Sequence, residues 1–316
     1  MPPRRKVLVN PPAAKSESAI PGQPCPETAF INGRFVNCDE AVVSVFDRGF
    51  LYGDGLFETV LILNGRPFRW EEHLDRLSCG AEFLGIALPF SPALLRDWVH
   101  QLIQLNQFPD ALLRLNLSRG TGARGYSPRG SAAPTVVMTL HPAPVFTAPT
   151  PSHWRLIVAS LRLPANEPLA RFKTCNKLPQ ILARAEAEAA GADEALMLNT
   201  DGQVIESSAG NLFWISGGVV CTPPITSGIL AGVTRAVLLD LCSNLALPTR
   251  EGNIDPDSLE AVEGIFLSLS SLGLVEAVTL NGRPLKQSPL TRRIYHSFVQ
   301  LLARETGFNP PAWIND

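Results

Sequence analysis

Four prolines cluster near the middle of the chain, at Pro142, Pro144, Pro149 and Pro151. Proline fixes the backbone angle φ and has no N–H group, so a dense cluster interrupts both helices and interior strands. On each side of the cluster, strand-like segments joined by Asn-Gly turns are mixed with segments of helical spacing. The sequence therefore predicts two mixed α/β domains connected by a linker at residues 145–152.

The apolar patterns give approximate boundaries for these domains. We predict a mobile, proline-rich N-terminal arm at residues 1–27, a small α/β domain at 28–144 and a larger domain at 153–316. Apolar residues at helical spacing predict helices at 71–86, 92–106 and 178–191.

The overall composition excludes several classes of protein. The chain has 316 residues, of which 45% are hydrophobic and 18% charged, and its net charge is −2. These values indicate a globular protein without the broad basic surface that binds nucleic acid, and no apolar stretch is long enough to span a membrane. Six cysteines without a C-x-x-C pair and five histidines without metal-ligand spacing predict a cytoplasmic protein with reduced thiols and no metal.

Lysine is scarce in this chain, yet two lysines lie four residues apart in RFKTCNKLPQIL, at Lys173 and Lys177. A lysine that forms a Schiff base must be partly neutral near pH 7, which burial or a neighbouring cation can achieve. The alternative is a pair of solvated charges at the start of a helix. The spacing alone does not distinguish the two interpretations.

Two other segments carry groups that could bind a cofactor. In GQVIESSAGNLFW, Glu206 follows a hydrophobic strand and precedes small residues, so its carboxylate could approach a ring nitrogen. In TPPITSGILAGVTR, Val233 and Thr234 begin a helix whose free N–H groups could hold a phosphate. The alternatives are a surface glutamate at a strand end and an ordinary helix N-cap.

The segment SRGTGARGYSPRG contains the letters of G-x-G-x-x-G, but no helix follows and no acidic residue lies about 20 positions further on. A dinucleotide site is therefore disfavoured. Arg119 and Arg124 in this predicted loop suit a substrate that carries a carboxylate, unless the loop is merely solvated. His73 shares a predicted helix with Arg76 and is interpreted as structural.

Several segments together resemble one enzyme family in order and spacing. They are DRGFLYGDGLFET, EEHLDRL, SRGTGARGYSPRG, FKTCNKLPQILARAEA, DEALMLNTDGQVIESSAGNLFW and TPPITSGILAGVTR. Between about residues 28 and 300 the chain resembles the fold-type IV enzymes that use pyridoxal 5′-phosphate. The resemblance implies a two-domain fold with the cofactor between the domains, a homodimer, and a small-molecule substrate.

The resemblance also implies roles for individual residues. Lys173 matches the lysine that forms the Schiff base with the cofactor, and Glu206 matches the acid that bonds the pyridine nitrogen. Lys177 falls where lyases of the family often have another basic residue, whereas branched-chain aminotransferases typically have tyrosine. The positions that match phosphate-binding residues are Arg76, Val233, Thr234, Ser270 and Ser271.

Within the family, SRGTGARGYS and NLFWISGGVVCTP most resemble 4-amino-4-deoxychorismate lyase, which forms 4-aminobenzoate and pyruvate in folate biosynthesis. On this hypothesis Arg119 or Arg124 holds a substrate carboxylate. Tyr52 and Phe57 line the substrate pocket or, alternatively, belong to the core. Two other functions stay open: a class IV aminotransferase that acts on branched-chain or D-amino acids with 2-oxoglutarate, and a non-catalytic relative that binds a metabolite.

Overall fold

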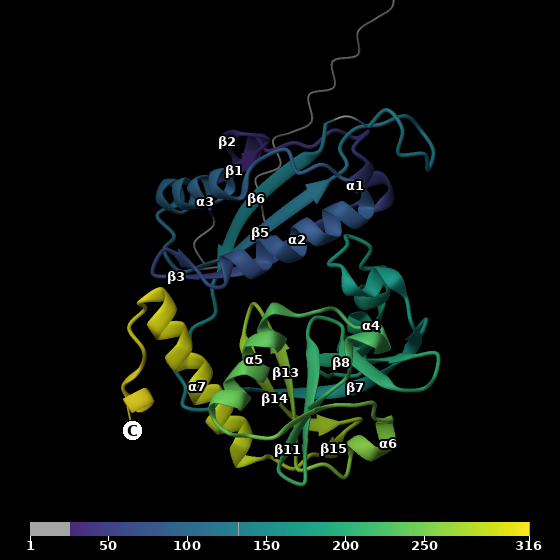
Figure 1. The fold of residues 1–316 in the computed structure, drawn as a ribbon, viewed down its shortest axis with the longest axis vertical. Coiled ribbons are helices and arrows are strands. Elements are labelled where there is room, and N and C mark those ends of the chain that lie inside the picture. Colours follow the sequence, from purple (N-terminus) through teal and green to yellow (C-terminus); the bar gives the residue numbers. More distant parts are fainter. Residues whose placement is uncertain (1–25, 132, 316) are drawn as a thin grey trace, which may run out of the picture.

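The structure is a computed structural model that describes residues 26–131 and 133–315. It contains two β-sheets with flanking helices, one above the other in Figure 1. This is the mixed α/β architecture that the sequence predicts. Apart from its last two residues, the predicted arm at 1–27 lies outside the described part of the chain.

The first sheet is antiparallel throughout, in the order β2-β1-β6-β5-β3-β4. Two of its hairpins turn at the predicted Asn-Gly pairs, Asn32-Gly33 and Asn64-Gly65, whose four residues all have positive φ. Its strands are β1 (Thr28–Ile31), β2 (Arg34–Asn37), β3 (Gly55–Leu63), β4 (Arg66–Pro67), β5 (Ala111–Ser118) and β6 (Thr135–Pro142).

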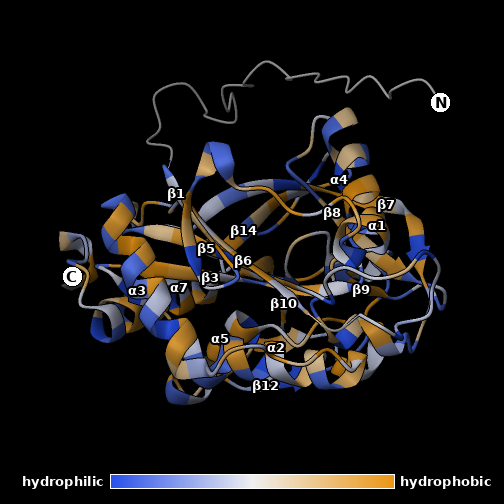
Figure 2. Cartoon of the chain, turned by 90° about the horizontal axis from the view of Figure 1, so that it is seen from above, coloured by the Kyte–Doolittle hydropathy of each residue, from blue (hydrophilic) through white to orange (hydrophobic). Residues whose placement is uncertain are grey.

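Three helices accompany the first sheet: α1 (Arg48–Tyr52), α2 (Trp70–Leu84) and α3 (Pro92–Asn106). The last two confirm the predicted helices within two residues. In α3, Ser91 caps the first turn by accepting a hydrogen bond from the Leu94 N–H group, and Pro92 occupies the first turn, where its missing N–H costs nothing. Hydrophobic and hydrophilic residues alternate around α2 and α3, whose apolar sides pack on the sheet (Figure 2).

The second sheet is mixed and has the order β12-β11-β10-β13-β14-β7-β8-β9, with β15 paired to β14. Because β9 also pairs with β10, where Glu206 lies opposite Asn211, the six strands from β10 to β9 close on themselves. The strands are β7 (Ser152–Leu163), β8 (Glu194–Asn199), β9 (Val204–Ser207), β10 (Asn211–Ser216), β11 (Val219–Thr222), β12 (Thr249–Glu251), β13 (Gly264–Leu269), β14 (Gly273–Leu280) and β15 (Arg283–Pro284).

Helices α5 and α7 pack against the second sheet and against part of the first. Leu61, Leu63 and Phe68, from the first half of the chain, join Val237 and Phe298 in one hydrophobic cluster. The two halves therefore share part of their core, and the domain boundaries at 144 and 153 stay a prediction. The helices of this half are α4 (Leu178–Ala189), α5 (Val233–Asn244), α6 (Pro256–Leu259) and α7 (Pro289–Thr306). No helix in the described ranges is both long and apolar enough to cross a membrane.

Strand β3 is buried on both faces, because each face packs against a different part of the protein. Leu56, Val60 and Ile62 point into the cluster formed with α2 and α3, whereas Leu61 and Leu63 enter the cluster around α5 and α7. Successive residues of a strand alternate between its faces. The strand thus carries side chains to both the core of the first half and the boundary between the halves.

The end of α1 contacts the segment that contains the two lysines. Gly53 closes α1 with φ 67°, and its carbonyl accepts a hydrogen bond from Nδ2 of Asn176 at 3.2 Å. A Cβ atom at Gly53 would lie 2.5 Å from Oδ1 of Asn176. Position 53 therefore requires glycine for two reasons, its left-handed backbone and the close approach of Asn176.

We predict that Gly53→Ala lowers the free energy of unfolding more than Gly65→Ala does. Both glycines have similar positive φ, 67° and 71°, but nothing lies within 4 Å of a Cβ atom at Gly65. The two variants should differ in free energy of unfolding by about 1 kcal/mol, because displacing Asn176 in Gly53→Ala breaks one hydrogen bond of that value. Urea unfolding of the two variants measures it, and equal stabilities would contradict the proposed contact.

Candidate active site

A cavity of about 560 Å³ lies between the two sheets. The first sheet contributes residues of β3 and β5, and the second half contributes β9, the turn between β13 and β14, one side of α4 and the start of α5. Eight of the residues that sequence analysis singled out line this cavity together: Phe57, Arg76, Lys173, Lys177, Glu206, Thr234, Ser270 and Ser271.

Backbone hydrogen bonds fix Lys173 at the boundary between the halves. The N–H of Phe57 donates to the Lys173 carbonyl, and the N–H of Cys175 donates to the Gly55 carbonyl, each at 2.9 Å. These bonds attach residues 173–175 to the first residues of β3, where Thr174 and Leu56 form an isolated antiparallel β-bridge. The Nζ atom of Lys173 lies 4.7 Å from the centroid of the Phe57 ring.

Burial, reinforced by the nearby Arg76 cation, lowers the pKa of Lys173 to about 7, although the Glu58 carboxylate acts in the opposite direction. An amine with this pKa is largely neutral at slightly alkaline pH and can act as a nucleophile or a base. Lys177, at the start of α4, lines the same cavity, and burial lowers its pKa too, opposed by Glu206. Neither lysine is therefore the solvated charge of the alternative interpretation.

Glu206 lies on β9 at the point where the second sheet closes. Its Oε2 atom accepts hydrogen bonds from the Leu230 N–H at 3.1 Å and from Nδ2 of Asn211 at 3.5 Å. Burial raises the pKa of this carboxyl, while the Leu230 N–H and the two lysines oppose the change. A partly desolvated carboxylate in this setting is suited to bond a cationic N–H group.

The opposite end of the cavity gathers donors for an anion. Helix α5 begins at Val233 without a side-chain cap, and its preceding residue, Gly232, cannot carry a Cβ atom because that atom would lie 2.0 Å from Oδ1 of Asn211. Val233 itself lines a neighbouring cavity and not this one. Thr234 has a hydroxyl 3.5 Å from that of Ser270.

Arg76 completes this group of donors from α2. Its guanidinium contacts the Glu58 carboxylate and donates from Nη1 to the Ala231 carbonyl at 2.9 Å. An uncapped helix N-terminus, hydroxyl groups and a guanidinium are the chemical groups that bind phosphate. The residues present therefore fit the phosphate of pyridoxal 5′-phosphate, and Glu206 at the other end fits its ring nitrogen.

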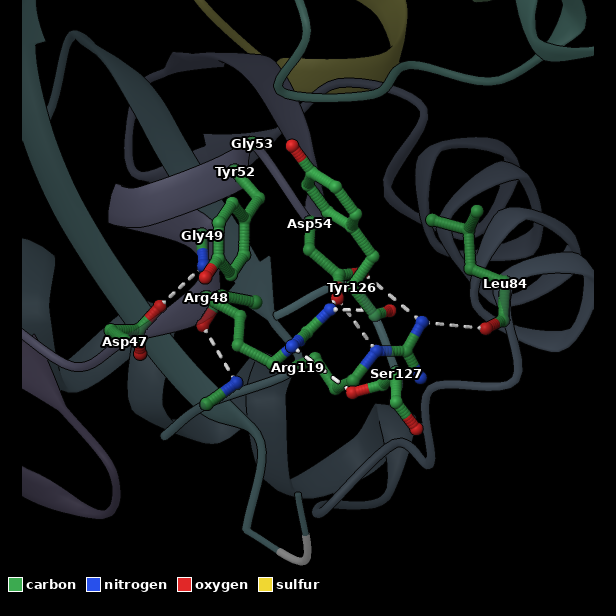
Figure 3. A network of polar contacts seen from close by, with 12 residues as sticks. Asp47, Arg48, Gly49, Tyr52, Gly53, Asp54, Leu84, Arg119, Tyr126 and Ser127 are labelled. Atoms are coloured by element: carbon green, nitrogen blue, oxygen red, sulfur yellow. Dashed lines mark hydrogen bonds and ion pairs between the residues drawn. The ribbon is translucent and has the colours of Figure 1, made fainter. Parts of the chain in front are cut away.

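Besides Val233, three predicted residues do not line the cavity, which corrects the expectation for Arg119, Arg124 and Tyr52. Arg119 donates to the Asp54 carboxylate at 2.8 and 3.1 Å and to the carbonyls of Leu84 and Gly85 (Figure 3). These bonds occupy four of the five N–H groups of Arg119. Arg124 is exposed.

Tyr52 belongs to the same polar network rather than to the cavity. Its hydroxyl accepts a hydrogen bond from the Gly125 N–H at 3.1 Å, and the Arg48 guanidinium lies 5.0 Å from its ring centroid. Arg48 also donates to three carbonyls of the 125–127 segment and to Asp54 (Figure 3). This network holds the loop between β5 and β6 against α1.

The sequence interpretation missed Arg114, a cavity residue on β5. Its guanidinium lies 3.4 Å from the centroid of the Phe57 ring and donates to Oδ1 of Asn116 at 3.1 Å. Burial lowers the pKa of Arg114. The signal was present in ALLRLNLS, where Arg114 and Asn116 alternate with leucines and so share the face opposite the core.

Comparison with known proteins gives the family. Residues 55–279 match the family model "Amino-transferase class IV". The chain is 32% identical over 276 residues to a putative branched-chain-amino-acid aminotransferase of Methanocaldococcus jannaschii, covering 86% of this chain and 95% of the relative.

Two solved structures are also similar. The 4-amino-4-deoxychorismate lyase of Pseudomonas aeruginosa has a TM-score of 0.75 and 31% identity, with 89% of this chain and 100% of the lyase covered. A branched-chain amino acid aminotransferase from the organism abbreviated T.th., solved with pyridoxamine 5′-phosphate, has a TM-score of 0.83 and 27% identity, with coverages of 91% and 97%. With the family match and a cavity that fits both ends of the cofactor, the chain belongs to the class IV aminotransferase family and is a fold-type IV enzyme that depends on pyridoxal 5′-phosphate.

Proposed function

We propose that this enzyme is a lyase that converts 4-amino-4-deoxychorismate to 4-aminobenzoate and pyruvate, a reaction of folate biosynthesis. The observation that carries the proposal is the excess of cationic side chains in the cavity. Besides Arg76 and Lys173, the cavity is lined by Arg114, Lys177 and Arg184, against only two carboxylates, Glu188 and Glu206. The substrate carries two carboxylates, which such a surface attracts.

The proposed roles follow from the two ends of the cavity. Arg76, the N-terminus of α5 and the hydroxyls of Thr234, Ser270 and Ser271 hold the phosphate, and Glu206 bonds the ring nitrogen. When bound, pyridoxal 5′-phosphate supplies an electron sink next to the amine-bearing carbon of the substrate.

Lys173 acts as the base in this proposal. Its Nζ atom, with a pKa of about 7, takes the proton from the amine-bearing carbon. The ether bond to the enolpyruvyl group then breaks, and that group receives a proton to become pyruvate. The six-membered ring becomes aromatic as 4-aminobenzoate. The two products together contain all atoms of the substrate, so no water and no oxidant is consumed.

Arg114 replaces Arg119 and Arg124 as the proposed ligand of a substrate carboxylate. It is half-buried on the cavity side of β5, and its contact with the Phe57 ring holds the guanidinium in place with a cation–π interaction of about 0.5–2 kcal/mol. Lys177, on the opposite wall next to α4, is then available for the second carboxylate, whereas Arg184 is paired with Glu188 and Glu194.

An aminotransferase is the second candidate, and apolar side chains in the cavity favour it. Phe57, Ile181 and Leu269 offer a surface for an aliphatic substrate, and the relative from M. jannaschii is named as a putative branched-chain enzyme. On this alternative, Arg114 would receive the distal carboxylate of 2-oxoglutarate, and the amino acid could be branched-chain or of D configuration.

We also propose that the enzyme is a cytoplasmic homodimer. Apolar side chains are exposed on α1 and the segment before it, including Val42 at 78%, Phe46 at 66% and Phe50 at 75%, and Tyr126 beside them is 88% exposed. Such a patch supports a contact with a second copy. The described cysteines form no disulfide, as a reducing compartment would require.

The decisive assay for the proposed reaction measures pyruvate and 4-aminobenzoate released from 4-amino-4-deoxychorismate. We expect both products in equal amounts, without any added 2-oxo acid. The matched assay follows transfer of the amino group from leucine or D-alanine to 2-oxoglutarate. Amino transfer without lyase activity would overturn the lyase proposal in favour of the aminotransferase.

We predict that Lys173→Ala abolishes turnover and covalent attachment of the cofactor, whereas Lys177→Ala retains attachment. The physical reason is that the segment at 173–175 is fixed to β3 while Lys177 begins α4. Borohydride reduction followed by digestion and mass spectrometry locates the label. A label on the peptide at Lys177 in the wild-type enzyme would show that the wrong lysine was chosen.

The rate of attachment should also depend on pH. Because the pKa of Lys173 is lowered to about 7, the amine loses its proton as the pH rises through that value and becomes nucleophilic. Addition of pyridoxal 5′-phosphate to the apoenzyme should therefore accelerate between about pH 6 and 8 and then level off, when followed by absorbance. A rate that continues to rise to pH 10 would indicate an amine with an ordinary pKa.

A further inference from the structure

A carboxylate lies behind the phosphate end of the cavity, on the face of β3 that is turned toward α2. Glu58 is 1% exposed, and its two oxygens accept three hydrogen bonds. They come from Nε and Nη2 of Arg76, at 2.8 and 2.6 Å, and from Nδ1 of His73 at 2.7 Å. Phe57 and Thr59, its neighbours along the strand, point to the opposite face and line the cavity.

This arrangement determines which donors of Arg76 are available. The guanidinium has five N–H groups. Two bond Glu58, and one on Nη1 bonds the Ala231 carbonyl, next to the start of α5. One N–H group on Nη1 and one on Nη2 are left, and two N–H groups on neighbouring nitrogens match two oxygens of a phosphate.

We propose that Glu58, held in turn by His73, is the positioning residue of the phosphate anchor and fixes the guanidinium of Arg76 in the orientation that binds the cofactor. The inference rests on the role of Arg76 proposed above. It assigns a function to the buried pair Glu58 and His73, neither of which lines the cavity or reaches the reacting atoms.

The protonation of the pair is consistent with this role. Burial raises the pKa of Glu58, but hydrogen bonds from His73 and Arg76 outweigh burial and bring it to about 2, so Glu58 is ionised. Burial lowers the pKa of His73, although Glu58 opposes the change. An ionised carboxylate can only accept, so a neutral His73 must donate from Nδ1. The carboxylate then keeps both of its partners in one orientation.

Glu58 also acts on the reactive lysine through its charge. Arg76 lowers the pKa of Lys173, and Glu58 raises it. The carboxylate therefore offsets part of the positive charge that the phosphate anchor places near the amine. Removing the charge of Glu58 should lower the pKa of Lys173 further, an effect that a purely structural ion pair far from the cavity would not have.

The test compares two substitutions that separate position from charge. Glu58→Asp keeps the charge but withdraws the carboxylate by one methylene group, and Glu58→Gln keeps the length but removes the charge. For each apoenzyme, dissociation constants are measured for pyridoxal 5′-phosphate and for pyridoxal, which lacks the phosphate. The dissociation constant for pyridoxal divided by that for pyridoxal 5′-phosphate, called the ratio below, reports the phosphate anchor alone.

We expect both variants to lose about tenfold to a hundredfold in affinity for pyridoxal 5′-phosphate, the effect of one charge-assisted hydrogen bond, and to change little toward pyridoxal. In Glu58→Gln the pH midpoint of cofactor attachment should also move down, whereas in Glu58→Asp it should stay near that of the wild type. If Glu58→Gln does not fold, the ratio measured for Glu58→Asp decides the proposal by itself.

Two control variants make the outcome unambiguous. Glu251→Gln removes another arginine–glutamate pair, the 2.9 Å contact with Arg235, which does not line the cavity. This variant should leave the ratio and the pH midpoint unchanged. Arg76→Gln should reduce the ratio at least as much as the Glu58 variants do.

An unchanged ratio in Arg76→Gln would refute the proposed phosphate anchor itself. A reduced ratio in Arg76→Gln with an unchanged ratio in Glu58→Asp would refute only the positioning role of Glu58. Loss of stability in the Glu58 variants without a change in ratio or pH midpoint would show that the ion pair serves folding alone, and it would likewise overturn the proposal.

Discussion

Two backbone hydrogen bonds between residues 173–175 and the beginning of β3 determine much of the site. They attach a segment of the second half of the chain to a strand of the first half, so that the amine of Lys173 lies against Phe57 and near Arg76 and Arg114. Because β3 is packed on both faces, this attachment point has little freedom to move. The position and the basicity of the amine both follow from this one contact.

The second principle of the site is an uneven distribution of charge. Cationic groups outnumber carboxylates around the cavity, and burial strengthens their influence on one another. Lysine pKa values are lowered and that of Glu206 is raised, all toward neutrality at moderate pH. An anionic cofactor and an anionic substrate relieve this excess, so the cavity is electrostatically prepared for both.

The sequence predicted the turns and several helices, and it selected residues that the fold brings to one cavity, because these features depend on local patterns. Asn-Gly turns, helix starts and the spacing around Lys173 can be seen within a few positions. Contacts between distant segments could not be seen in this way. In the sequence, Arg119 suits a substrate carboxylate. In the fold it bonds Asp54, which lies 65 residues away along the chain. Glu58 and His73 likewise meet only because β3 and α2 pack together, and His73 could be interpreted no further than as structural.

Asn211 connects the two ends of the proposed cofactor site. Its Nδ2 atom donates to the Leu230 carbonyl at 2.9 Å and lies 3.5 Å from Glu206, while its Oδ1 atom occupies the space beside Gly232, just before α5. One short side chain thus contacts both the strand that carries Glu206 and the turn that leads into α5. The relative position of these two elements consequently depends on a single amide, so that a change at Asn211 would disturb both at once.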